Sequence, residues 1–105
     1  MPEDIREARI LVVDDHATNR LVFREMLRSW GCRFDEATDG AQGLQMLHKA
    51  HEAGDPFRIA LIDMQMPGMD GKTLGHKVKE DPGLRDTRLV MLTSVGSRGD
   101  SAELQ

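Results

Sequence analysis

Two kinds of segment alternate along the chain, short apolar runs and longer stretches with helical periodicity. Four apolar runs predict strands, at Arg9–Val13, Cys32–Ala37, Phe57–Asp63 and Arg88–Thr93. The first of these is rich in β-branched and aliphatic residues and ends at two acids, which is typical of a strand buried on both faces. The run at Cys32–Ala37 is the least apolar of the four.

Helices are predicted between these strands. Apolar residues recur at helical spacing from Thr18 to Trp30, and Gly31 follows where a helix usually ends. A second helix follows the turn pair Asp39–Gly40 and ends near Gly54, and a third, shorter one ends before Asp81. Alternation at this spacing predicts right-handed βαβ crossovers, and therefore an α/β fold in which helices cover both faces of a parallel sheet.

Composition narrows the class of protein. A chain of 105 residues forms one domain at most, and its 39% hydrophobic and 30% charged residues suit a soluble globular domain. No apolar run approaches the roughly 20 residues of a membrane span. The charged start MPEDIREAR and the lone Cys32 favour the cytoplasm. A net charge of −4 argues against direct binding to nucleic acid.

Polar functional residues stand where three of the predicted strands end. Asp14 and Asp15 follow the first strand. Asp63 ends the third and Thr93 the fourth. Ligands bind beyond the carboxyl ends of parallel strands, so neighbouring ends would gather three carboxylates and a hydroxyl in one pocket. Such a pocket favours Mg²⁺, which would also neutralise an incoming phosphoryl group and leave one carboxylate free to attack phosphorus.

Three motifs resemble those of the response-regulator receiver domain, and the likeness covers nearly the whole chain. Val12–Asp15 (VVDD) resembles its acidic pair, Leu61–Gly71 (LIDMQMPGMDG) its phosphorylation loop, and Met91–Ser94 (MLTS) its switch strand. The run Asp15–Arg20 (DHATNR) also resembles receivers joined to hybrid sensor kinases. The resemblance implies a flavodoxin-like, doubly wound parallel sheet with strand order 2-1-3-4-5.

The resemblance also implies a role for each site residue. Asp63 would be the phosphoacceptor, Asp15 would bind Mg²⁺ directly, and Asp14 would bind it largely through water. The backbone carbonyl of Gln65 would be a further ligand, and Thr93 would bond a phosphoryl oxygen. The donor would be the phosphohistidine of a histidine kinase or of a phosphotransfer domain, and the output a switched protein-interaction surface.

The chain is shorter than the family's five βα units. Residues 1–105 are expected to be a receiver domain truncated after the fourth strand, with the start of the fourth helix near Val95–Gln105 and without the fifth strand and helix. The lysine after the family's fifth strand would be missing too, since Lys79 is the last lysine. The strand Arg88–Thr93 would then be an open sheet edge beside uncovered apolar surface, which predicts self-association or strand exchange.

Other interpretations stay open at this point. A receiver-like interaction module that is not phosphorylated in this truncated form is the main alternative function. A Mg²⁺-dependent phosphatase is less favoured, because it needs a second acid or base near Asp63 and Gln65 fills that place. His48 and His51 have helical spacing but no third ligand nearby, which indicates an exposed polar face, and His16 carries no stronger signal.

Overall fold

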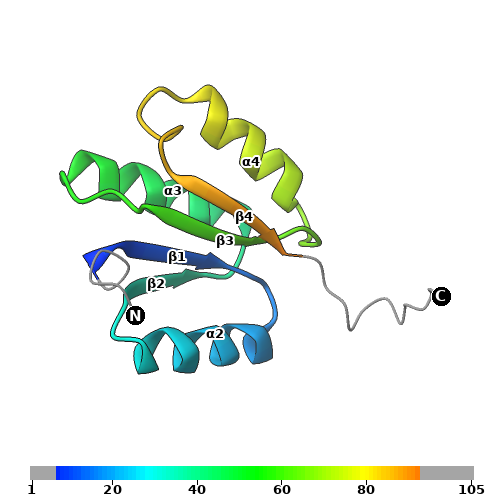
Figure 1. Cartoon of the computed structure of the whole chain (residues 1–105). Coiled ribbons are helices and arrows are strands. Elements are labelled where there is room, and N and C mark those ends of the chain that lie inside the picture. Colours follow the sequence, from blue (N-terminus) through cyan, green and yellow to red (C-terminus); the bar gives the residue numbers. More distant parts are fainter. Residues whose placement is uncertain (1–6, 93–105) are drawn as a thin grey trace.

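The structure, a computed structural model, describes residues 7–92 (Figure 1). Its elements in chain order are β1 (Arg9–Val13), α2 (Ala17–Ser29), β2 (Arg33–Ala37), α3 (Gly40–Glu52), β3 (Ile59–Asp63), α4 (Gly71–Glu80) and β4 (Arg88–Leu92). All four predicted strands are present, and so are the three predicted helices. The helix start predicted within residues 95–105 lies outside the described residues.

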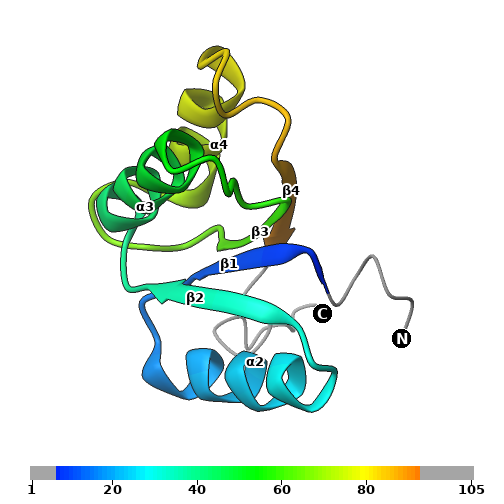
Figure 2. The same ribbon diagram turned by 90° about the vertical axis from the view of Figure 1, so that its left-hand side faces the viewer.

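The four strands of the described part form one parallel sheet in the order β2-β1-β3-β4. Helix α2 covers one face of this sheet, and α3 and α4 cover the other (Figure 2). This arrangement confirms the predicted α/β, flavodoxin-like fold with strand order 2-1-3-4. Strand β1 lies in the interior of the sheet and is paired on both sides, which explains why its sequence is almost wholly apolar.

Alternating side chains of β1 build two separate cores. Leu11 and Val13 point to the α3 and α4 face, where they join the larger cluster of buried residues. Ile10 and Val12 point to the opposite face and join a smaller cluster under α2. From α2 itself, Leu27 is the fully buried contribution to that cluster. More of the buried apolar side chains therefore lie on the face that carries α3 and α4.

Helix α2 exposes part of its apolar surface. Val22 and Trp30, whose spacing helped to predict the helix, are 58% and 40% exposed, and Leu21 is 48% exposed. The physical reason is that α2 lies alone on its face of the described sheet, so only the residues that face β1 and β2 are covered. Periodicity predicted the helix correctly but overstated how much of its apolar surface is buried.

Strand β4 ends the described sheet. Within residues 7–92 it pairs with β3 alone, and its residues Val90 and Met91 are 39% and 38% exposed. In the described part of the chain β4 is therefore one edge of the sheet, and the open edge expected from truncation stays a prediction. Self-association through it stays a prediction. Among the described helices, none combines the length and the apolar character needed to cross a membrane.

Candidate functional site

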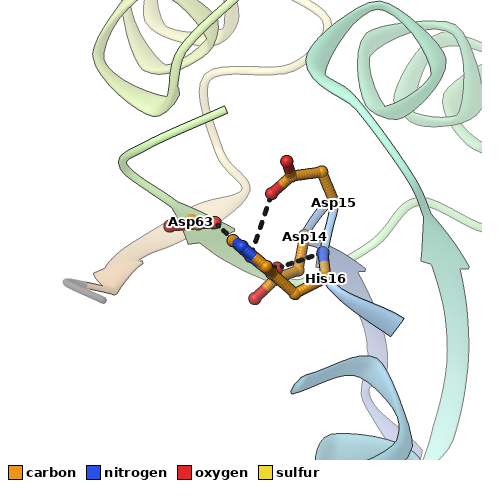
Figure 3. A group of neighbouring side chains, drawn as sticks. All are labelled: Asp14, Asp15, His16 and Asp63. Atoms are coloured by element: carbon orange, nitrogen blue, oxygen red, sulfur yellow. Dashed lines mark hydrogen bonds and ion pairs between the residues drawn. The ribbon is translucent and has the colours of Figure 1, made fainter. Parts of the chain in front are cut away.

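Strand register brings the acidic residues together. Val13 of β1 is paired with Ile62 of β3, so the residues that follow them, Asp14 and Asp63, lie at the same edge of the sheet. Both residues are almost completely buried, at 2% and 1% exposure. Ligand atoms of Asp14, Asp15, Asp63 and one further residue, His16, all lie within 4.8 Å of one another (Figure 3).

The carboxylate of Asp14 is held by the start of α2. Its Oδ1 accepts a hydrogen bond from the backbone N–H of His16 at 2.9 Å, and its Oδ2 accepts one from Asn19 Nδ2 at 3.2 Å. Arg20 donates from its guanidinium to the backbone carbonyl of Asp14 at 2.7 Å. Three residues of the run that resembles hybrid-kinase receivers thus orient the first acid of the pair.

The loop after β3 holds the second part of the site. The backbone N–H of Gln65 donates to Asp63 Oδ1 at 3.1 Å, which turns the chain back over the carboxylate. The loop then closes where the backbone N–H of Gly71, the first residue of α4, donates to the carbonyl of Met64 at 3.3 Å. The predicted site residue Gln65 therefore lies beside Asp63, whereas Thr93 lies outside the described residues.

His16 is the site residue that sequence reasoning missed. Its ring nitrogen Nδ1 is close to a carboxylate oxygen of each acid, 3.1 Å from Asp15, 3.3 Å from Asp14 and 3.7 Å from Asp63 (Figure 3). One signal in the sequence could have identified it. His16 directly follows the acidic pair, so it lies at the same strand end, where ligands bind in parallel sheets. By contrast, His48 and His51 belong to α3 and take no part in this cluster.

The donor set suits a divalent cation. Asp15 Oδ1 is buried and accepts no hydrogen bond of good geometry from any described residue, although His16 Nδ1 lies 3.1 Å away. Within residues 7–92, His16 is also the one side chain that forms ion pairs with Asp14 and Asp15, so no ammonium or guanidinium balances their charge. Buried carboxylates this close together are stabilised by a hard cation with oxygen ligands.

The fold and these motifs belong to a known family. The family model for the response regulator receiver domain matches residues 10–104, and the chain is a member of that family. Receiver domains of this kind belong to two-component signalling. The sequence-based resemblance is therefore confirmed, and it extends over nine-tenths of the chain.

Individual relatives agree with this assignment. The chain is 40% identical over 93 residues to the response regulator PleD of Caulobacter vibrioides, covering 89% of this chain and 19% of PleD. It is 34% identical over 96 residues to the chemotaxis protein CheY of Pseudomonas aeruginosa, covering 90% of this chain and 73% of CheY. It thus spans about a fifth of PleD and nearly three quarters of CheY.

A solved structure matches in three dimensions as well. The receiver domain of the sensor histidine kinase PA1611 from Pseudomonas aeruginosa superposes with a TM-score of 0.75 at 26% identity, over 91% of this chain and 75% of that one. That protein was crystallised with a magnesium ion coordinated in its active site cleft.

Proposed function

We propose that this chain is a phosphoacceptor switch in which Asp63 takes a phosphoryl group from the phosphohistidine of a histidine kinase or phosphotransfer domain. The single observation that carries the proposal is the convergence of three carboxylates, from two neighbouring strand ends, around Asp63 at the end of β3. Membership of the receiver family supports it, since that family is shown by a match to residues 10–104.

The ligands of a Mg²⁺ ion in this site would be Asp14, Asp15, Asp63 and the backbone carbonyl of Gln65. The buried, unsatisfied Oδ1 of Asp15 supports this assignment, and so does the magnesium ion in the cleft of the PA1611 receiver. Asp14 already accepts hydrogen bonds from the N-cap residue His16 and from Asn19 of α2, which favours contact with the ion through water. When bound, Mg²⁺ supplies positive charge against the oxygens of the transferring phosphoryl group.

The position of Asp63 supports it as the nucleophile. It ends β3 in the segment that resembles the family's phosphorylation loop, and the backbone N–H of Gln65 donates to its Oδ1 at 3.1 Å. In the proposed step, a carboxylate oxygen of Asp63 attacks phosphorus and forms a P–O bond while the P–N bond to the donor imidazole breaks. The imidazole leaves with the electron pair, and the product is an acyl phosphate on Asp63.

The new anion would then act as the switch. The proposed partner of the phosphoryl oxygen is the Thr93 hydroxyl, which follows directly after β4 in the sequence. Movement of Thr93 toward the anion would reorder the surface around β4 and change which proteins bind there, as in other switches that respond to an added phosphate. The proposed setting is the cytoplasm, where the kinase partners of such switches present their phosphohistidines.

Mass spectrometry of the intact chain tests the proposal. Treated with acetyl phosphate and Mg²⁺, the wild-type chain should gain one phosphoryl group, and Asp63→Asn should gain none. Asp86→Asn is the matched control, because Asp86 is an exposed aspartate of the segment between α4 and β4. A gain that survives Asp63→Asn would refute the assignment of the acceptor. No gain in the wild-type chain would favour an interaction module that works without phosphate.

A further inference from the structure

The imidazole of His16 lies at ligand spacing from the carboxylates. Two ligands about 2.1 Å from one ion are about 3.0 Å apart when adjacent in an octahedron, and about 3.4 Å apart in a tetrahedron. His16 Nδ1 lies 3.1 Å and 3.3 Å from oxygens of Asp15 and Asp14, and 3.7 Å from Asp63 (Figure 3). The nitrogen and the oxygens of Asp15 and Asp14 are therefore spaced as adjacent ligands of one ion, whereas the oxygen of Asp63 lies farther from the nitrogen than adjacent ligands do.

The local backbone places this side chain over the acids, with Nδ1 at hydrogen-bond distance from Asp14 Oδ1, 3.3 Å. His16 is the N-cap residue of α2, with φ of −95° and ψ of 119°, and within the described residues its side chain makes no capping hydrogen bond. Asp39 and Asp70, the N-caps of α3 and α4, each accept a hydrogen bond from their own helix. The backbone N–H of His16 instead donates to Asp14 Oδ1, and this hydrogen bond directs the imidazole over the acids. The His16 side chain is 55% exposed, so an incoming ion can reach it.

A nitrogen ligand changes which metal the site prefers. Mg²⁺ takes oxygen ligands, whereas neutral imidazole, with its proton on Nε2, donates the Nδ1 lone pair to first-row transition metals. We propose that His16 is a nitrogen ligand of this site and increases its preference for Co²⁺ and Zn²⁺ over Mg²⁺. This inference rests on the proposed function because it concerns the same site, but it assigns a nitrogen ligand that the carboxylates do not provide.

Parallel titrations with Co²⁺ and Mg²⁺ test the inference. Visible absorption reports Co²⁺ binding through its d–d bands, and calorimetry reports Mg²⁺ binding. Loss of a nitrogen ligand to oxygen weakens the ligand field and moves the d–d bands to longer wavelength. His16→Ala should weaken Co²⁺ binding by about tenfold or more and shift those bands, while Mg²⁺ binding changes by about twofold or less. His51→Ala is the matched control, since it removes an exposed imidazole from the last turn of α3.

A measurement on the unaltered chain keeps the test independent of any effect of the substitution on folding. On addition of Zn²⁺, the ¹⁵N resonance of His16 Nδ1 should shift as the ion binds, whereas the ring nitrogens of His51 should stay in place. Equal Co²⁺ affinity in the wild type and His16→Ala would overturn the inference. So would tighter binding of both ions by His16→Ala, because it would mean that the ring blocks the site.

The two proposals fail in different ways. A wild-type chain that binds Co²⁺ through His16 but takes up no Mg²⁺ would support the nitrogen ligand and contradict the proposed magnesium site. A chain that binds Mg²⁺ and is phosphorylated on Asp63, with Co²⁺ affinity unchanged by His16→Ala, would leave the proposed function standing and overturn the role of His16.

Discussion

The packing of α4 against the site predicts unequal effects for two identical substitutions in one helix. A Cβ atom at Gly71 would lie 2.6 Å from the carbonyl oxygen of Asp63 and 2.9 Å from Met64 Cα, both backbone atoms that cannot rotate away. Among residues 7–92, a Cβ atom at Gly75, one turn later, would meet Met91 Cε at 2.7 Å and Leu89 Cδ1 at 3.6 Å, both side-chain atoms. The Met91 side chain is flexible and partly exposed, so it can move aside.

These contacts set the size of the difference. Replacing glycine by alanine inside a helix stabilises it by about 0.5–1 kcal/mol, while overpacking a tight site costs about 1–3 kcal/mol. Gly71 is the first residue of α4, where the helical gain is small, so Gly71→Ala should destabilise the chain by about 1–2 kcal/mol. Gly75→Ala should range from neutral to about 1 kcal/mol stabilising.

Urea unfolding followed by circular dichroism measures this difference. With a slope of about 1–3 kcal/mol per molar for a small domain, the two midpoints should be separated by about 1 M, with Gly71→Ala the lower. Gly71→Ala should also slow phosphorylation, because its clash falls on the backbone of Asp63, and Gly75→Ala should leave the rate close to that of the wild type. Equal midpoints for the two variants would refute the packing argument.

Two further substitutions test other parts of the fold. Arg24 donates hydrogen bonds of 2.6 and 2.8 Å to Glu36, and these bonds lower the pKa of the Glu36 carboxyl below its usual 4.5. The stability that the pair contributes is therefore present above pH 4.5 and is lost as the pH falls through the lowered pKa. Glu36→Gln should therefore flatten the decline of Tm with acid, and an unchanged decline would contradict this reading. The buried Thr87 donates from Oγ1 to the carbonyl of Phe57 at 2.8 Å, so Thr87→Val should lower the free energy of unfolding by about 1–3 kcal/mol in urea titrations. No measurable loss would show that this hydrogen bond contributes little.

The acidic core of the site was predictable because it depends on simple regularities. Apolar runs end abruptly at Asp14 and Asp63, and strands that are parallel neighbours place such ends together. Helix starts were less well defined by the same pattern. Helices α3 and α4 begin at glycines, Gly40 and Gly71, and the N-caps Asp39 and Asp70 mark those starts better than hydrophobicity does.

The position of His16 was not predictable from periodicity. Its side chain reaches the carboxylates because the backbone at the N-cap of α2 is extended and because its own N–H donates to Asp14. Both features depend on the path of the chain from β1 into α2. The exposure of Val22 and Trp30 depends likewise on which elements cover α2, which no local pattern encodes. The role of Thr93 rests on sequence alone, since that residue lies outside the described part of the chain.

Chemical trapping of the phosphorylated residue tests the central claim most directly. Borohydride reduces an acyl phosphate to an alcohol, so a phosphorylated aspartate becomes homoserine, which peptide mass spectrometry locates. After treatment with acetyl phosphate and Mg²⁺, homoserine should stand at position 63, and it should be absent when Mg²⁺ is withheld. Homoserine at Asp14 or Asp15 instead, or at no position, would contradict the assignment of Asp63 as the phosphoacceptor.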